Sequence, residues 1–130
     1  MAESIYKELS YKVQGAFFEV YKSLGTGHKE LIYEKALLTQ LKELNLEVEN
    51  QKRIPIHFRK QYLGVYVPDI VVDDLILIEI KCKPVMVQED IRQFWHYLKV
   101  SKYKVGYLVN FGNPGRVHYL RRVYDLARKN

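Results

Sequence analysis

The sequence predicts an α/β domain in which helices flank a mixed central sheet. Several segments have apolar residues at steps of three and four, as amphipathic helices do, and others are short runs rich in valine and isoleucine, as strands are. A helical segment joins two of the predicted strands, and such a connection favours a parallel pair. Because 130 residues is the length of one ordinary domain, we expect residues 1–130 to form a single domain.

Two helices are predicted first. Residues 3–22 carry an apolar stripe that includes Val13, Phe17 and Val20. The sequence LGTGHKE ends this helix, because its two glycines are poor helix residues and good turn residues. Residues 29–44 form the second predicted helix, with leucines among its apolar positions.

A β-rich region follows the helices. Segments 47–58, 61–72 and 75–82 are separated by the polar sequence RKQ and by the acidic pair Asp73 and Asp74. Their β-branched and aromatic residues, with short polar connections between them, predict a meander of three strands.

The last third of the chain returns to a helix and then a strand. Residues 84–102 have helical apolar spacing, and residues 104–112 form the next predicted strand. In the closing segment, 116–127, the pattern beyond Leu120 fits a strand or a helix equally well.

The charge balance favours a polyanionic partner. Lysine and arginine outnumber aspartate and glutamate by 21 to 15, and the excess grows towards the C-terminus. A basic surface of this kind suits nucleic acid. The predicted nucleic-acid-binding residues are Lys99, Lys102, Lys104, Arg116, Arg121 and Arg122.

Composition also bears on location. The sequence has no apolar stretch near the roughly 20 residues that span a bilayer, and its N-terminus lacks the pattern of a signal peptide. A single cysteine, Cys82, excludes an intramolecular disulfide and a site of clustered thiolates. We therefore expect a cytoplasmic protein with no membrane partner.

Three charged residues interrupt the most apolar segment, VPDIVVDDLILIEIKC. They are Asp69, Glu79 and Lys81, and burying a charge without a partner costs several kcal/mol. Glu79 and Lys81 are two residues apart, so on a strand they project from one face, while Ile80 and Cys82 project from the other. The apolar neighbours indicate that both faces are covered, so these charges need partners.

The turn between the second and third strands decides whether Asp69 is such a partner. A three-residue loop, 73–75, would pair Asp69 with Glu79, whereas a strict two-residue turn would pair Asp69 with Ile78 and place the acids on opposite faces. Two acids on one face repel each other unless a divalent cation lies between them. Oxygen ligands of this kind suit Mg²⁺ or Mn²⁺.

Lys81 beside such a cation indicates nuclease chemistry. Its ammonium group would stabilise a pentavalent phosphorus or orient a metal-activated water. Hydrolysis of an unreactive phosphodiester requires both the Lewis acid and the activated water.

These residues resemble the PD-(D/E)XK nuclease superfamily. Its motif is matched by Pro68-Asp69 and by Glu79-Ile80-Lys81. The acid, acid and lysine occur in the order and strand context of that motif.

Two further motifs strengthen the resemblance. Gln93 and Tyr97, in QFWHY, are similar to the QxxxY motif of RecB-like members. Gly27, Glu30 and Tyr33 match the pattern after which the GxxExxY proteins, a branch of the same superfamily, are named.

The resemblance covers residues 24–112 and implies a restriction-endonuclease-like αβββαβ core with an extra N-terminal helix. It implies Asp69 and Glu79 as metal ligands, with the main-chain carbonyl of Ile80 as a further ligand. Lys81 would be the catalytic lysine, and Mg²⁺ or Mn²⁺ the cofactor.

The resemblance also implies roles for residues on the helices. Glu30 would be a catalytic acid that faces the metal, directly or through water, Gln93 would orient Lys81 or the substrate, and Tyr97 would be accessory. The residues themselves leave alternatives open. Glu30 also suits the positive end of a helix dipole, with Glu34 one turn further as its rival, and Tyr97 also suits the core.

Structural roles are favoured for three other residues. Gly64 suits a turn or bulge, Tyr33 suits packing between helix and sheet, and Cys82 suits a small core position. The four histidines are too scattered along the sequence to indicate a metal site.

The sequence therefore predicts a Mg²⁺- or Mn²⁺-dependent nuclease that acts on DNA, with RNA as the second candidate substrate. The alternative is a catalytically silent nucleic-acid-binding or assembly module with the same fold. A protein partner that supplies substrate specificity fits either function. The first helix fits two arrangements, packing on the sheet or forming the face of a homodimer.

Overall fold

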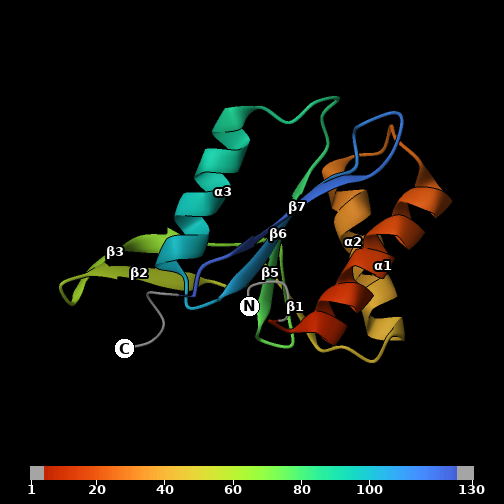
Figure 1. Cartoon of the computed structure of the whole chain (residues 1–130). Coiled ribbons are helices and arrows are strands. Elements are labelled where there is room, and N and C mark those ends of the chain that lie inside the picture. Colours follow the sequence, from red (N-terminus) through yellow and green to blue (C-terminus); the bar gives the residue numbers. More distant parts are fainter. Residues whose placement is uncertain (1–4, 126–130) are drawn as a thin grey trace.

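The computed structural model describes residues 5–125, which form three helices and seven strands (Figure 1). The helices are α1 (Lys7–Leu24), α2 (Glu30–Glu43) and α3 (Gln88–Val100). The strands are β1 (Val48–Asn50), β2 (Ile54–Phe58), β3 (Gln61–Tyr66), β4 (Ile70–Val72), β5 (Ile76–Lys81), β6 (Val105–Asn110) and β7 (His118–Val123). The main sheet has the order β1-β4-β5-β6-β7, and β2 pairs with β3 in a separate hairpin.

One face of the main sheet is covered by α1 and α2 (Figure 1). The predicted stripe of α1, including Val13, Phe17 and Val20, is buried in one cluster with Ile78 and Ile80 of β5. Burial of these apolar side chains stabilises the fold by roughly 25 cal/mol for each Å² of apolar surface removed from water. The first helix thus packs on the sheet, which is one of its two predicted arrangements.

The opposite face is covered by α3 (Figure 1). Phe94 and Leu98 of the helix are buried with Leu77 and Leu108 of the sheet. The helix lies close because Gly106 is beneath it, where a Cβ atom would come within 2.9 Å of Phe94 Cζ. Glu79 and Lys81 share the face of Leu77, so they point to the α3 side of the sheet.

The predicted three-strand meander is wrong in one respect, because each of its first two strands is broken in the middle. The inner halves form β1 and β4, with Val48 opposite Val72, and the outer halves form β2 and β3, with Ile54 opposite Tyr66. The two ladders share one register as far as the pair Ile56 and Gly64, so they are parts of one long hairpin, and the register shifts by one residue between Ile56 and His57. The outer part leaves the main sheet and projects past α3 (Figure 1).

Asp69 lies where the hairpin divides. Pairing is interrupted there because Gln51 has a φ of 57°, outside the extended region, and Pro68 has no N–H to donate. A single main-chain hydrogen bond of 3.0 Å, from Gln51 N–H to the Asp69 carbonyl, crosses the gap.

β5 and β6 are parallel, as the helical connection between them predicted, with Lys81 opposite Asn110. β7 pairs antiparallel with β6, so the undecided last element is a strand as far as Val123. A mixed sheet with helices on both faces confirms the predicted fold class. The final two residues of the predicted element, 126–127, lie outside the described residues.

The helices differ from their predicted ranges by only a few residues at each end, although residues 3–4 of the first predicted helix lie outside the described part. None of the helices within residues 5–125 combines the length and the hydropathy needed to cross a bilayer.

Candidate active site

The turn between β4 and β5 brings Asp69 opposite Glu79. Val72 pairs with Ile76, so three residues, 73–75, form the loop between the strands. Within this loop, the N–H of Leu75 donates to the carbonyl of Val72 at 2.9 Å and closes the turn. This is the three-residue alternative of the two registers considered from sequence.

Asp73 and Asp74 make this turn at φ values of 51° and 52°. The left-handed region is uncommon for residues other than glycine, but aspartate tolerates it better than most. The side chain of Asp73 also accepts a hydrogen bond of 2.8 Å from Glu47 N–H, which holds the turn against the segment before β1.

Asp69 and Glu79 are joined through the main chain at two points. The N–H of Asp69 donates to Glu79 Oε1 at 3.3 Å, and the N–H of Ile80 donates to Asp69 Oδ2 at 2.7 Å. Each carboxylate therefore holds the backbone beside the other. The carbonyl of Ile80 as a ligand stays a prediction.

Glu79 is half-buried and carries an unusual pKa. Burial, and after it the nearby charge of Asp69, raises this pKa to about 7. The hydroxyl of Tyr66 acts against this shift by donating to Glu79 Oε2 at 2.8 Å. The site thus concentrates negative charge that is only partly compensated.

Tyr66 connects Glu79 to α3. Its ring stacks on Tyr97, with centroids 4.2 Å apart and an interplanar angle of 5°. Tyr97 is therefore packed in the half-buried layer between α3 and the sheet, against the tyrosine that donates to Glu79. The sequence had indicated no role for Tyr66, since a tyrosine in a strand is most simply a packing residue.

Lys81 faces the first turn of α3. Its Nζ lies 4.0 Å from Asp90 Oδ1, while Lys83 makes the closer pair with Asp90 Oδ2, at 2.8 Å. The hydrogen bond from Lys83 lowers the pKa of Asp90 below its usual range. Asp90 was not predicted, and an acid in the first helical turn is too common for its sequence position to distinguish it.

Gln93 and Tyr97 line a narrow cleft together with Glu79, Lys81 and Asp90. The cleft has a volume of about 10 Å³, room for about one water molecule. The two residues of the QxxxY pattern therefore lie at the acid–lysine pair, although no hydrogen bond of Gln93 is seen among residues 5–125.

Glu30 is the first residue of α2, and it interacts electrostatically with Asp69 and Lys81. Its pKa is raised by burial and then by Asp69 and Glu34, whereas Lys81 lowers it. Glu34, its predicted rival, is buried and accepts two bonds of 3.3 Å from Gln51 Nε2. Glu34 thus holds Gln51, the residue at which the hairpin divides. Glu30 is the more exposed of the two carboxylates.

Tyr33 holds the loop that precedes α2. It is fully buried and stacked on Phe111, with ring centroids 4.8 Å apart, so it packs between helix and sheet. Its hydroxyl donates to the carbonyl of Gly25 and accepts from His28 N–H at 3.4 Å. One side chain therefore ties the loop before α2 to the helix.

Cys82 is free and half-buried beside the core. Burial raises the pKa of its thiol to about 11, with Glu30 and Asp69 adding to the shift, so the thiol is neutral at pH 7. A neutral thiol is a poor nucleophile, which suits the structural role favoured from sequence. Within the described residues, no three histidine, cysteine, aspartate or glutamate side chains are grouped closely enough to hold a metal by themselves.

The predicted nucleic-acid-binding residues are dispersed, and most have partners within the protein. Lys102 pairs with Asp74 at 2.9 Å and Lys104 with Asp125 at 3.3 Å. Arg121 donates to the carbonyl of Ile5 at 2.6 Å.

The other three differ in their surroundings. Lys99 lies 5.7 Å from the Trp95 ring centroid, and Arg122 donates to the main chain at 3.2 Å. Arg116 is exposed in the loop between β6 and β7, at the sheet end where Lys81 lies. Of the six residues, Arg116 is therefore the one at the same end of the sheet as the candidate site. Contact of all six with nucleic acid stays a prediction.

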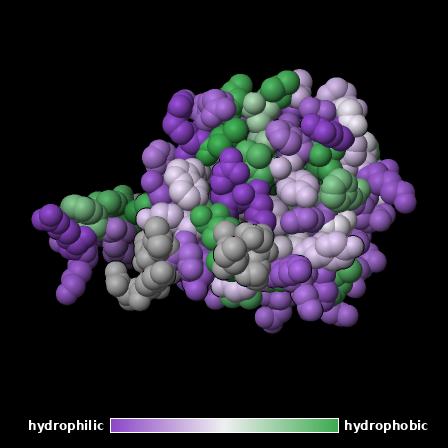
Figure 2. Space-filling view, viewed as in Figure 1, coloured by the Kyte–Doolittle hydropathy of each residue, from purple (hydrophilic) through white to green (hydrophobic). Residues whose placement is uncertain are grey.

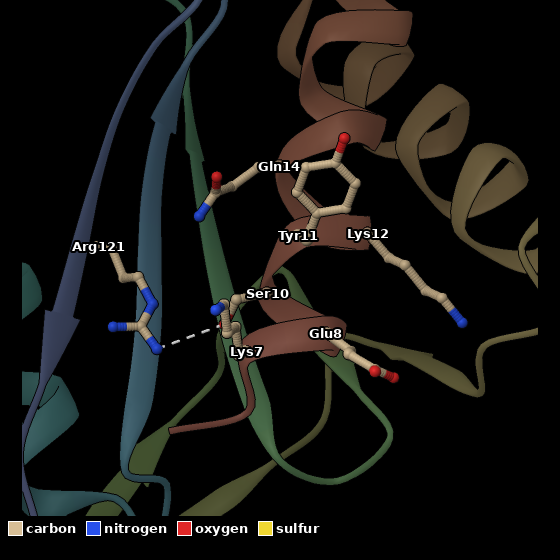
Figure 3. Close-up of a pocket in the computed structure, with 7 residues that line it drawn as sticks. All are labelled: Lys7, Glu8, Ser10, Tyr11, Lys12, Gln14 and Arg121. Carbon is tan, nitrogen blue, oxygen red and sulfur yellow. Dashed lines mark hydrogen bonds between the residues drawn. The ribbon is translucent and has the colours of Figure 1, made fainter. Parts of the chain in front are cut away.

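A separate cavity of about 620 Å³ lies between α1 and β7 (Figure 3). Gln14 and Ser10 point from α1 towards Arg121, whereas Lys12 extends away from the sheet. None of the residues that line it belongs to the Asp69–Glu79 site, so the cavity has no part in that chemistry.

Comparison with known proteins identifies a family and a similar fold. A family model described as "PD-(D/E)XK nuclease superfamily" matches residues 7–123. The chain is also similar to a solved structure titled "Crystal structure of SSO0001", with 22% identity and a TM-score of 0.53. This match covers 93% of the chain but 58% of that structure, and at this identity it concerns the fold alone. A search of curated proteins finds no match.

Proposed function

Because the chain belongs to the PD-(D/E)XK nuclease superfamily, we propose that it is a nuclease that uses Mg²⁺ or Mn²⁺ to hydrolyse phosphodiester bonds of DNA, with RNA as the second candidate substrate. Within the superfamily, the GxxExxY branch fits best, because Gly27, Glu30 and Tyr33 serve the loop and helix that face the acids. The function of that branch is part of the proposal.

The observation that carries the proposal is the pairing of Asp69 with Glu79 and the raised pKa of Glu79. Two carboxylates on one face of a half-buried hairpin, with Glu79 shifted to about 7, have more negative charge than nearby donors neutralise. Such a pair is destabilising for a fold that needs only packing. A divalent cation with oxygen ligands would remove the repulsion.

The donor set fits Mg²⁺ or Mn²⁺. These ions are commonly held by one or two carboxylates and complete their coordination with water and substrate phosphate, so three grouped protein ligands are not required. Asp69 and Glu79 would hold the ion, with Ile80 as the main-chain ligand and Glu30 reaching it directly or through water. When bound, the ion supplies Lewis acidity and lowers the pKa of its water.

The other residues position the substrate. Lys81 is 33% exposed at its side chain and faces the cleft, so its ammonium group can neutralise charge that develops on phosphorus. Gln93, on the wall of the same cleft, can orient Lys81 or a phosphate oxygen. Asp90, which is itself paired with Lys83, lies 4.0 Å from Lys81 Nζ and can hold the lysine at the cleft.

Cleavage of DNA substrates with Mn²⁺ tests this proposal. Single-stranded, double-stranded, branched and flapped DNA are incubated with the protein, and products are resolved on denaturing gels. Asp69→Asn and Lys81→Ala are each expected to reduce the rate by about 100-fold or more, since each removes a group that acts on the developing charge. Glu19→Gln, at an exposed site on α1, serves as the control and is expected to cut normally.

Cleavage that survives Asp69→Asn and Lys81→Ala would show that it comes from another site or from a contaminant. Failure of the wild-type protein to cut any of the substrates would sink the nuclease proposal itself.

A catalytically silent nucleic-acid-binding or assembly module is the second candidate. It is favoured by the hydrogen bonds that both acids already accept from the protein, 2.7 Å at Asp69 and 2.8 Å at Glu79. Calorimetric titration with Mn²⁺ separates the two. Absence of heat, together with salt-sensitive binding of DNA, would support the silent module.

A further inference from the structure

The β2–β3 hairpin is the one part of the described chain whose strands lie outside the main sheet. Only its base is buried, through Ile54 and Tyr66. Near its tip, Phe58, Tyr62 and Leu63 are 60%, 61% and 63% exposed. Figure 2 shows the hairpin extending from the body with hydrophobic and hydrophilic residues side by side. Packing among residues 5–125 does not account for these apolar side chains.

The charge of this hairpin has one sign. The segment 51–68 contains two lysines and two arginines and no aspartate or glutamate. Lys52 is paired with Glu49 and Asp74, but among residues 5–125 neither Arg59 nor Lys60 has an acidic partner. Arg59 instead lies 5.2 Å from the centroid of the Phe58 ring.

The tip has residues that the turn does not favour. Arg59 and Lys60 have φ values of 49° and 68°, the left-handed conformation of a two-residue hairpin turn, for which Asn-Gly is preferred. Holding two long side chains there costs about 1 kcal/mol each. Two basic residues at strained positions of an exposed tip are therefore poorly explained by folding.

The shape and charge select the partner. A single strand is bound by a groove that tracks its backbone, whereas this hairpin is convex. The major groove of B-form DNA is about 12 Å wide and admits a two-stranded ribbon, while the A-form RNA groove is too narrow. A convex ribbon with a basic tip thus matches double-stranded DNA.

The base of the hairpin is part of the candidate active site. Tyr66, the last residue of β3, donates to Glu79 at 2.8 Å, and Asp69 follows three residues later. At about 3.3 Å per residue, the tip lies roughly 20 Å from this point. A duplex held by the tip would therefore pass within reach of the acids.

We propose that the β2–β3 hairpin is a DNA-binding arm that enters the major groove of a duplex, with Arg59 and Lys60 on phosphates and the base of the arm beside Asp69 and Glu79. The second half of this inference rests on the proposed nuclease function. The first half, binding of duplex DNA by the tip, does not require turnover.

The test measures binding without hydrolysis. A fluorescein-labelled DNA duplex is titrated in EDTA across a series of KCl concentrations. Arg59→Asn/Lys60→Gly removes both charges and installs the preferred turn, so its melting temperature is expected to equal or exceed that of the wild type. Its affinity is expected to fall about tenfold or more, and the slope of log K against log salt to fall by about 2.

Two comparisons isolate the effect of the tip. Arg59→Gln/Lys60→Gln removes the same charges but keeps the strained turn, and it is expected to lose as much affinity. Lys12→Gln/Lys22→Gln removes two exposed charges from α1 and is expected to bind nearly as the wild type does. Double-stranded RNA and single-stranded DNA are expected to bind more weakly than the duplex.

Three results would contradict the proposal that the hairpin is a DNA-binding arm. One is a wild-type protein that binds no duplex DNA, and another is loss of affinity that is equal in the tip and α1 variants. The third is a wild-type dimer, seen by sedimentation, that the tip variants dissociate, since the occupant would then be a second copy. Absence of Mn²⁺-dependent cleavage bears on the nuclease proposal alone.

Discussion

At the scale of single residues, Glu79 is controlled by a tyrosine that has no place in the sequence motif. Tyr66 donates to its carboxylate and stacks on Tyr97, so the helix and the acid are linked through one aromatic pair. The bond lowers the pKa of Glu79 from the higher value that burial and Asp69 would produce. Tyr66 therefore keeps part of the Glu79 population ionised near pH 7.

Removal of the hydroxyl tests this link. Tyr66→Phe is expected to raise the pKa of Glu79 above about 7 and to lower the free energy of unfolding by about 1–2 kcal/mol at pH 8, where Glu79 is ionised. Carbon-detected NMR titration of the carboxyl and urea denaturation measure the two effects.

Tyr97→Phe is the matched control, since it keeps the stacked ring and removes a hydroxyl that has no hydrogen bond to residues 5–125. It is expected to leave both quantities almost unchanged. Equal effects of the two substitutions would mean that the rings, and not the bond to Glu79, matter.

At the scale of elements, the close approach of α3 to the sheet holds one wall of the cleft. Gly106 of β6 makes this approach possible, because a Cβ there would lie 2.9 Å from Phe94 Cζ and 3.0 Å from Leu77 Cδ1. Protein interiors are closely packed, so an added methyl group forces neighbouring side chains to move. The position of Gln93 on the cleft thus depends on a glycine in a neighbouring strand.

Gly106→Ala is expected to lower the free energy of unfolding by about 1–3 kcal/mol, because the added methyl group must displace the ring of Phe94 or Leu77. Urea denaturation measures the change. Gly15→Ala is the control, since a Cβ there meets no atom within 4 Å and the helix gains stability, about 0.5–1 kcal/mol. A neutral Gly106→Ala would show that α3 shifts freely.

At the scale of the whole molecule, Asp74 joins segments that are far apart in sequence. Its carboxylate accepts hydrogen bonds from Tyr103 at 2.6 Å, Lys102 at 2.9 Å and Lys52 at 3.0 Å. The turn before β5, the connection before β6 and the start of the projecting hairpin therefore meet at one exposed side chain. These bonds, led by that from Tyr103, hold the pKa of Asp74 well below its usual range.

This lowered pKa predicts the direction of a pH effect. A carboxylate with a depressed pKa in the folded state contributes stability above its unfolded pKa, about 3.9, and loses it as the pH falls through the folded pKa. Asp74→Asn is expected to cost about 1 kcal/mol at pH 7, a small value because the group is solvent-exposed, and progressively less below about pH 4.

Urea denaturation at several pH values measures this difference. Glu89→Gln removes an exposed carboxylate with Arg92 as its partner at 3.2 Å, and it is expected to cost less at every pH. A difference for Asp74→Asn that stays constant from pH 7 to about pH 3 would contradict the account.

Much of the fold follows from local patterns. The stripe of α1, the two glycines after it and the alternation of the strands act within a few residues of each other, so they could be predicted. The break in the first two strands could not, because uninterrupted β-rich texture does not reveal that Gln51 leaves the extended region. The third strand and its parallel partner were predicted because the intervening helix requires that arrangement.

The candidate site divides in the same way. Sequence alone determined the identity and order of Asp69, Glu79 and Lys81 and the face that Glu79 shares with Lys81, because strand periodicity is a local property. Only the tertiary structure decided that Leu75 shifts the register so that the acids meet, and that Tyr66 supports one of them. Register and long-range contacts depend on how separate segments pack together, and that information is not held by any one segment.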